Sequence, residues 1–214
     1  MARIALIHAL AHAVAPINEE MAMAWPDCIR MNLLDDSLSA DLARSGQGLD
    51  AQMHQRFEVL AAYAQSAGAQ GILFTCSAFG ACIEAVAASR PLMPVLKPNE
   101  AMIAQATQRG SHVGLIASFA PTLRSMPMEF PASLKLSTRL VTQAMDALDK
   151  GNVHLHDALV VAAALELALD GCDVIALAQF SMARAQALVV KATGLPVLTA
   201  PSSAVQVLRQ RILN

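Results

Sequence analysis

Cysteine and histidine are the residue types of this chain best suited to catalysis or metal binding. The histidines do not suggest a metal site, because His8 and His12 form one close pair and His154 and His156 another, with no third ligand near either pair. We therefore expect neither a metal nor another cofactor. The sequence shows no signal-peptide pattern and no Cys-x-x-Cys pair, which favours reduced thiols over disulfides. The chain contains four cysteines: Cys28, Cys76, Cys82 and Cys172.

Cys76 is the cysteine best placed for chemistry. It follows an apolar run at residues 71–75 and precedes a helical pattern that begins Ser77-Ala78-Phe79-Gly80. The unpaired N–H groups and partial positive charge of a helix N-terminus stabilise a thiolate and can also bind a carboxylate. We therefore predict a lowered thiol pKa and a role for Cys76 as a base or nucleophile. The alternative is that Cys76 serves as a small buried hydrophobe, which is our interpretation of the other three cysteines.

Three further polar positions lie where apolar runs end. His8 closes the first run and could act as a general acid or carboxylate partner, although a hydrogen-bonded structural histidine is the alternative. Asp35-Asp36-Ser37 precedes a helical stretch and would cap it, with a functional role as the alternative. Lys97 could attract an acidic substrate, but a solvated lysine is the simpler interpretation.

The composition excludes several classes of protein. Hydrophobic residues make up 55% of the 214 positions, so the chain is not disordered. The net charge is −2 and no basic cluster occurs, which argues against nucleic-acid binding. The longest apolar run, Ala158–Leu165, is too short to span a membrane. We expect a soluble cytoplasmic protein whose excess of apolar surface is buried in a core and in a homo-oligomer, a dimer or larger.

Short apolar runs alternate with longer helical patterns along the whole chain, which predicts an α/β fold with parallel sheets. The predicted strands are Arg3–His8, Cys28–Leu34, Gly71–Thr75, Val95–Lys97, His112–Ala117, Leu134–Val141, Val174–Ala178 and Val197–Thr199. The predicted helices are Leu49–Ala67, Ala78–Ser89, Asn99–Arg109, Thr142–Asp149, Val153–Asp170, Ser181–Thr193 and Ser202–Leu213.

An internal repeat divides this pattern into two halves. A shift of 103 positions superposes residues 68–76 on residues 171–179, and Pro94-Val95-Leu96 matches Pro196-Val197-Leu198 at a shift of 102. We predict one lobe formed by residues 1–98 with 200–214, and a second lobe formed by residues 99–199. Ligands of open α/β sheets bind beyond the carboxyl ends of the strands. Two such lobes facing each other would place Cys76 and Gln179 on opposite walls of one cleft.

The segment Leu73-Phe74-Thr75-Cys76-Ser77-Ala78-Phe79-Gly80, with Leu177-Ala178-Gln179-Phe180-Ser181 half a chain later, resembles the aspartate/glutamate/hydantoin racemase superfamily. This superfamily also includes maleate isomerases and arylmalonate decarboxylases. The resemblance implies two Rossmann-like halves related by a pseudo-twofold axis, with a cofactor-independent site between them. It also implies that racemase-type members use one cysteine from each half, one thiolate removing the α-proton and the other thiol delivering a proton to the opposite face.

The chain departs from this pattern at Gln179, because an amide neither takes nor gives a proton at neutral pH. Racemisation by two thiols is therefore excluded, and a site with the single cysteine Cys76 remains. The first hypothesis is an isomerase-type enzyme that acts at the α-carbon of a small carboxylic acid. The alternatives are a decarboxylase-type lyase acting on a substituted malonate and a catalytically inactive protein that binds a small carboxylate.

The expected substrate-binding groups come from both halves. Backbone N–H groups and hydroxyls of the first half would hold the carboxylate, and the turn Ala117-Ser118-Phe119-Ala120-Pro121-Thr122, which resembles a pocket loop of the family, would contribute from the second. Gln179 would orient the substrate. Helix capping is the alternative role for the serines. The predicted binding residues are His8, Thr75, Ser77, Ala78, Ser118, Phe119, Gln179, Phe180 and Ser181.

Overall fold

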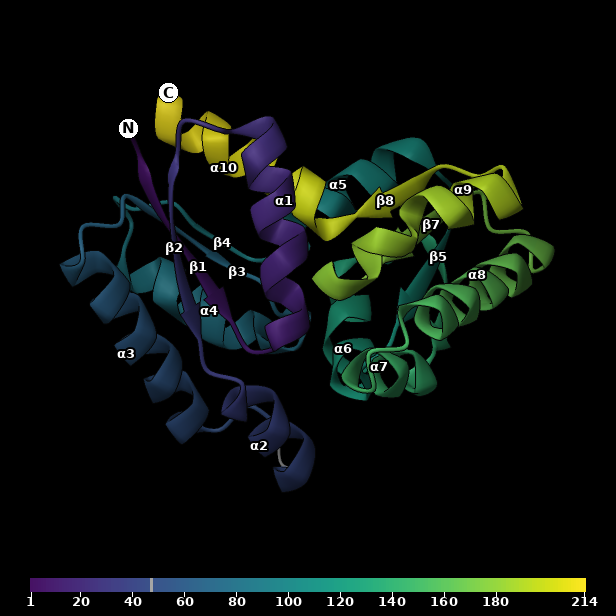
Figure 1. Ribbon diagram of the computed structural model, residues 1–214, viewed down its shortest axis with the longest axis horizontal. Coiled ribbons are helices and arrows are strands. Elements are labelled where there is room, and N and C mark those ends of the chain that lie inside the picture. Colours follow the sequence, from purple (N-terminus) through teal and green to yellow (C-terminus); the bar gives the residue numbers. More distant parts are fainter. Residues whose placement is uncertain (47) are drawn as a thin grey trace.

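The computed structural model describes residues 1–46 and 48–214, and its strands form two four-stranded parallel sheets (Figure 1). The strand orders are β2-β1-β3-β4 and β6-β5-β7-β8. The strands are β1 (Arg3–His8), β2 (Ile29–Leu34), β3 (Gly71–Phe74), β4 (Val95–Leu96), β5 (His112–Ala117), β6 (Lys135–Leu140), β7 (Val174–Leu177) and β8 (Val197–Thr199). The predicted α/β architecture of two similar halves is confirmed.

Helices cover both faces of each sheet, as parallel sheets require. The α-helices are α1 (Val14–Ala24), α2 (Ser37–Ser45), α3 (Ala51–Ser66), α4 (Gly80–Ser89), α5 (Glu100–Arg109), α6 (Ala120–Ser125), α7 (Thr142–Asp149), α8 (Val153–Leu169), α9 (Gln186–Thr193) and α10 (Ala200–Leu213). The short 3₁₀ helices are η1 (Ala11–Ala13), η2 (Ser77–Phe79), η3 (Met126–Glu129) and η4 (Phe180–Ala185). Among the described residues, no helix is both long and apolar enough to cross a membrane.

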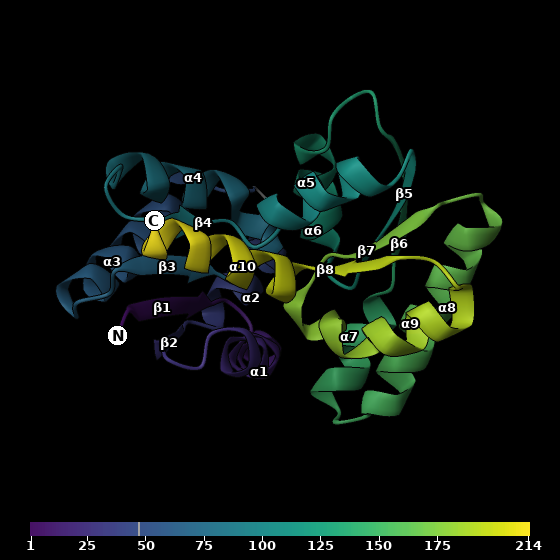
Figure 2. The same cartoon turned by 90° about the horizontal axis from the view of Figure 1, so that it is seen from above.

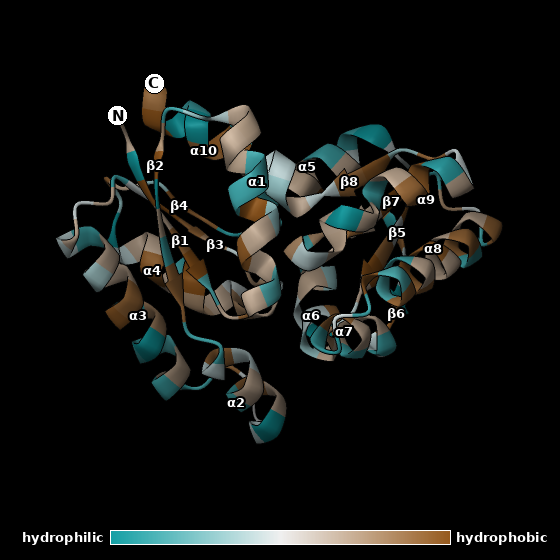
Figure 3. Cartoon of the chain, viewed as in Figure 1, coloured by the Kyte–Doolittle hydropathy of each residue, from teal (hydrophilic) through white to brown (hydrophobic). Residues whose placement is uncertain are grey.

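The central strands are apolar on both faces because each face packs against helices (Figure 3). In β1, Ile4 and Leu6 point into one hydrophobic cluster, while Ala5 and Ile7 point into another, beneath α2 and α3. All four side chains are at most 2% exposed. This double burial explains why the strands appear in the sequence as unbroken apolar runs rather than as alternating patterns.

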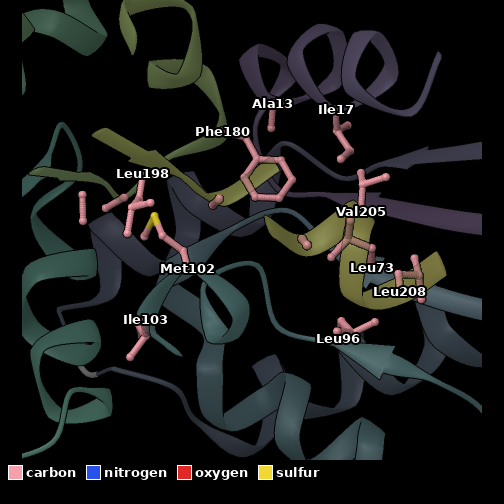
Figure 4. Close-up of a cluster of buried hydrophobic side chains, with 14 of the residues drawn as sticks. Ala13, Ile17, Leu73, Leu96, Met102, Ile103, Phe180, Leu198, Val205 and Leu208 are labelled. Carbon is pink, nitrogen blue, oxygen red and sulfur yellow. The ribbon is translucent and has the colours of Figure 1, made fainter. Parts of the chain in front are cut away.

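One hydrophobic cluster is shared by both lobes, and we call it the shared core (Figure 4). It joins the inner faces of the two sheets through α1, α5 and α10. The aromatic ring of Phe180, from the second half, packs in the same cluster as Ala13 and Ile17 of the first half. Its members include Ile4, Leu6, Ile17, Met21, Trp25, Leu73, Leu96, Met102, Ile103, Leu115, Met126, Phe130, Phe180, Leu198, Val205 and Leu208.

The internal repeat has a direct counterpart in the backbone. Gly68 ends α3 with φ +83°, and Gly171, its partner in the repeat, ends α8 with φ +84°. Glycine is the residue that adopts this left-handed conformation without steric cost. In both turns the following residue bonds back across the helix end, Ala69 N–H to Ala64 and Cys172 N–H to Leu167. The same turn therefore delivers the chain to β3 and to β7.

The chain passes between the two sheets after β4 and again after β8 (Figure 2). Helix α5 contacts β7 and β8 of the second sheet, while α10 returns to contact α1 and β3 beside the first. The division into residues 1–98 with 200–214 and residues 99–199 stays a prediction.

Three helices of the structure, α1, α2 and α6, have no counterpart among the helices whose bounds we predicted. For α2 the sequence predicts a helical stretch capped by Asp35-Asp36-Ser37 but not the bounds of that stretch. The predicted helix Ser181–Thr193 is wrong in its first turn and a half, because the backbone is 3₁₀-helical through Ala185 and α9 begins at Gln186. The remaining differences in the strands are one residue at an end, which reflects fraying of element boundaries.

Candidate active site

Cys76 lies where β3 ends and the chain turns into η2 and then α4. Its backbone is extended, with φ −121° and ψ 121°, so it caps η2 rather than belonging to it. The side chain is only 7% exposed and lines a narrow apolar hollow. That hollow is formed by Ile7, His8, Ala9, Leu38, Phe57, Phe74 and Cys76. The cysteine is therefore placed at the carboxyl edge of the sheet, as predicted, but beneath α2 rather than in open solvent.

Burial raises the pKa of the Cys76 thiol above its ordinary value of 9.0. Two contacts lower the pKa of this thiol, but by less than burial raises it. One is a hydrogen bond from the Ala78 backbone N–H, and the other is the Ser39 hydroxyl, whose Oγ lies 3.9 Å from Sγ. Our prediction of a lowered pKa is thus wrong. The helix that follows begins as a single 3₁₀ turn, and its N–H groups do not compensate for the loss of solvent. At neutral pH Cys76 carries its proton.

His8 is fully buried and both of its ring nitrogens have partners. Nδ1 lies 2.9 Å from Thr75 Oγ1, and Nε2 lies 2.9 Å from Asn32 Oδ1. Burial lowers the pKa of His8, while the bond to Asn32 raises it less. The neutral ring donates from Nε2 to the amide oxygen and accepts the Thr75 hydroxyl at Nδ1. His8 therefore fixes Thr75, the residue before Cys76, and matches the structural alternative described above.

Gln179 is held by the second half of the chain. Its Oε1 accepts the Ser118 backbone N–H at 2.9 Å, and its Nε2 donates to Thr122 Oγ1 at 2.9 Å. Thr122 Oγ1 is also 3.0 Å from Ser77 Oγ, on the residue after Cys76. A buried chain of hydrogen bonds thus runs Ser118–Gln179–Thr122–Ser77, from the end of β5 through the end of β7 and α6 to the end of β3. Through Thr122, the structure connects three of the predicted binding residues, Ser77, Ser118 and Gln179, across the two lobes.

The other predicted binding residues lie apart from this chain. Phe180 is 1% exposed and belongs to the shared core, and Phe119 packs against the cluster around Phe57 and Phe74. Ser181 lines a separate cleft of about 260 Å³ between α1 and η4, with His12 and Arg184. Within the described part of the chain its buried hydroxyl has no hydrogen-bond partner.

Two further residues singled out in the sequence, Lys97 and Asp35, form ion pairs within the chain. Lys97 is not solvated, because its Nζ contacts Glu84 at 2.6 Å and Glu129 at 3.1 Å, which corrects our simpler interpretation. These carboxylates raise the pKa of Lys97 against the opposing effect of burial. Asp35 accepts Arg56 at 2.7 Å and so ties the start of α2 to α3. Asp36 caps α2, as its position in the sequence indicated, although its side chain makes no capping hydrogen bond.

Three residues at the site were not predicted: Ser39, Thr122 and Asn32. Ser39 shares the buried face of α2 with Leu38 and Leu42, so a polar residue on an apolar stripe was the signal that could have revealed it. Thr122 stands in the turn that we quoted, but its partners are 45 and 57 residues away. No local pattern identifies contacts of that range.

Among residues 1–46 and 48–214 there is no group of three or more histidine, cysteine, aspartate or glutamate side chains that could hold a metal ion.

A family model described as Asp/Glu/Hydantoin racemase matches residues 14–208. The chain belongs to this family. The match includes strands β2 to β8, from both sheets, and both Cys76 and Gln179. No curated protein gives a significant match to the sequence.

Solved structures of racemases share the fold of this family member. Glutamate racemase from Francisella tularensis subsp. tularensis SCHU S4, solved with D-glutamate, has a TM-score of 0.76 at 14% identity, over 99% of this chain and 81% of that one. Allantoin racemase from Klebsiella pneumoniae has a TM-score of 0.67 at 17% identity, over 100% and 88%. An aspartate racemase homologue from Pyrococcus horikoshii OT3 has a TM-score of 0.72 at 12% identity, over the full length of both chains. At such identities the likeness shows the architecture.

Proposed function

We propose that this racemase-family protein is a cofactor-independent enzyme of the isomerase type, acting at the α-carbon of a small carboxylic acid through Cys76. The observation that carries the proposal is that Cys76 directly precedes Ser77, whose hydrogen bond to Thr122 joins the two lobes of this racemase-family chain. The Ala78 N–H, already directed at the thiol, is a donor for an anion. Relatives with the same fold act on amino acids, glutamate among them.

The single thiol supports a second candidate function. Cys76 holds its proton at neutral pH, because burial raises its pKa, and Gln179 offers no proton of its own. A protonated thiol is suited to deliver a proton to a carbanion. Decarboxylation of a substituted malonate generates such a carbanion and needs only one proton donor. This lyase activity is the alternative that the state of Cys76 favours.

The test is α-hydrogen exchange in D₂O, followed by NMR for a panel that includes both enantiomers of glutamate and aspartate, small hydroxy acids and substituted malonates. We expect exchange of at least one acid, and its loss in Cys76→Ala. Cys82→Ala is the matched control, because Cys82 is equally buried in the same lobe but sits within α4. Carbon dioxide release from a malonate, also dependent on Cys76, would identify the lyase. Binding with neither reaction would contradict both functions and indicate a carboxylate-binding protein.

The pH dependence separates the two chemistries. An isomerase needs the thiolate, so its rate should rise about tenfold per pH unit between pH 7 and 9, where the thiolate fraction is still small. A lyase uses the thiol as an acid, so its rate should stay level over that interval. A rate that falls between pH 7 and 9 would be inconsistent with Cys76 in either role.

A further inference from the structure

Helix α8 has an apolar face that stays exposed among the residues that the structure describes. Helices of globular proteins normally bury their apolar stripe and expose a polar one. In α8 the buried residues, Val160, Ala164 and Leu167 among them, pack on the second sheet, yet the opposite face is also apolar. That exposed stripe consists of Leu155, Ala158, Ala162, Leu165 and Leu169, and we call it the α8 stripe.

The spacing of the α8 stripe fits packing against another helix. Its members recur at intervals of three, four, three and four residues, which is the heptad spacing of helices that pack side by side. Leu155, Leu165 and Leu169 are 46%, 41% and 88% exposed in the single chain. The small residues Ala158 and Ala162 stand between the leucines and permit a close approach of two helix backbones, near the short end of the usual 8–10 Å range.

Four of the five members of the α8 stripe, all but Leu169, are arranged symmetrically about one level of the helix. The order Leu155, Ala158, Ala162, Leu165 is the same in both directions about the level of residue 160. If a second copy of α8 packs antiparallel across a twofold axis at that level, each Leu155 meets a partner's Leu165 and each Ala158 meets a partner's Ala162. An isologous interface needs a self-complementary surface of this kind.

Charges at the two ends of α8 favour the antiparallel direction. Lys150 and His154 lie at its start, and Glu166 and Asp170 at its end, all of them exposed. The same twofold axis places His154 opposite a partner's Glu166, and Lys150 opposite a partner's Asp170. Both acids are already paired with Arg139 of their own chain, Glu166 at 3.0 Å and Asp170 at 2.5 Å, so the partner's Lys150 would join an existing ion-pair network. A parallel pair would instead place Lys150 opposite a partner's Lys150, which is unfavourable.

We propose that the α8 stripe is a homodimer interface in which α8 packs antiparallel on α8 of a second copy. Asp149 also lies near the start of α8, but it is paired with His12 of its own chain at 2.8 Å. The interface lies on the outer side of the second lobe, where α8 is far from the first sheet (Figure 1). The residues that line the Cys76 hollow all belong to the first lobe and take no part in the interface.

The oligomeric state in solution tests the interface. Sedimentation equilibrium should give a dimer at about 100 µM. Ala162→Glu places two carboxylates near the twofold axis and should weaken the dimer at least about 100-fold. Ala162 is exposed, so the variant should keep its circular dichroism spectrum and melting temperature. Ala88→Glu, at an exposed alanine on α4, is the matched control and should remain dimeric. A monomeric wild type, or a dimer that Ala162→Glu leaves intact, would overturn the proposal.

Crosslinking tests the antiparallel register. A mixture of Leu155→Cys and Leu165→Cys chains should form a heterodimer with a short thiol crosslinker, because these positions meet across the axis. Either variant alone should not crosslink, because the introduced cysteines of the two copies in its homodimer would lie about 15 Å apart along the helix axis. The four native cysteines are buried and give little background. Crosslinking of either variant alone, without the mixed product, would show a parallel arrangement and refute the register.

Discussion

Gln179 is the residue that distinguishes this site from a two-thiol racemase site. Both polar atoms of its amide are hydrogen-bonded: Oε1 accepts from the Ser118 N–H, and Nε2 donates to the Thr122 hydroxyl. These bonds are buried, and each buried bond of this kind contributes about 1 kcal/mol to stability. The glutamine therefore fastens the end of β7 to α6 and, through Thr122, to Ser77. Within the proposed mechanism it replaces a proton carrier with a structural link.

Gln179→Cys tests whether position 179 faces the same reacting carbon as Cys76. We expect the variant to gain racemisation of an acid that the wild type only exchanges, since a second thiol can then protonate the opposite face. The loss of two hydrogen bonds should destabilise the fold by about 1–3 kcal/mol, measured by urea denaturation. The readout is circular dichroism or polarimetry of the acid over time.

Gln179→Ser is the control for this gain of function. It removes the same amide bonds and leaves a hydroxyl of comparable size to the thiol, but a serine does not carry the proton. It should match the destabilisation of Gln179→Cys and show no racemisation. A folded Gln179→Cys variant without racemisation would argue against opposed walls at Cys76 and position 179.

At the scale of residues, the sequence identified the position of Cys76 but not its protonation state. The position follows from a local pattern, an apolar strand that runs directly into a helical segment. The pKa depends on α2, since Leu38 lines the hollow around the thiol and Ser39 approaches it from a helix that begins 39 residues earlier. Long-range burial of this kind has no signature in residues 71–80.

Helix α2 covers the thiol and is tied down by one arginine. Arg56 of α3 contacts Asp35 and Asp41, which flank Leu38 and Ser39, each at 2.7 Å. The Arg56 side chain is 26% exposed, so these ion pairs are partly shielded from solvent. The hollow at Cys76 is too narrow for a carboxylic acid as it stands, so a substrate must displace α2 or open the lobes.

Arg56→Ala should loosen α2 and expose Cys76 to reagents. Two partly buried ion pairs contribute about 1 kcal/mol together, which corresponds to about a fivefold faster alkylation of Cys76. The rate is measured by mass spectrometry of the peptide that contains Cys76 after timed exposure to iodoacetamide. Arg44→Ala is the control, because Arg44 contacts the same Asp41 but is 82% exposed. Equal alkylation rates in all three proteins would mean that α2 does not control access to Cys76.

Among the elements, the central strands could be predicted because they are unbroken apolar runs, and the long helices because their apolar residues recur at helical spacing. Helix α8 is an instructive case: its spacing predicts its bounds to within one residue, but does not indicate which of its apolar residues are exposed. Helices α1 and α6 were missed, because Pro16 and Pro121 interrupt the helical pattern near their starts. Proline is tolerated in the first turn of a helix, so it marks these starts rather than breaks them.

The shared core makes the two lobes a single cooperative unit. Phe180 belongs to the second lobe by sequence but packs with Ala13 and Ile17 of the first. Two domains with separate cores would unfold independently, whereas lobes that share a core should lose it together. The repeat in the sequence suggested two similar halves but carried no information on this common interior, which forms only when both sheets are in place.

Phe180→Ala should destabilise the whole molecule rather than one lobe. The side chain is 1% exposed, and truncation of such a phenylalanine costs about 3–5 kcal/mol through lost burial and a new cavity. Calorimetry should show a single transition, shifted to lower temperature, in the variant as in the wild type. The exposed Leu92, truncated to alanine, is the control and should leave the transition unchanged. Two separate transitions in Phe180→Ala would contradict the cooperative unit.

The fixed amide of Gln179 has a stereochemical consequence. A planar carbanion in the proposed site would have the Cys76 thiol on one face and, on the other, an amide whose hydrogen bonds are already committed to Ser118 and Thr122. The proton would then arrive from one side only. A prochiral malonate would yield one enantiomer of its product. In a racemic acid, only one of the two enantiomers would exchange its α-hydrogen. The substitution that removes racemisation would thereby make the protein enantioselective.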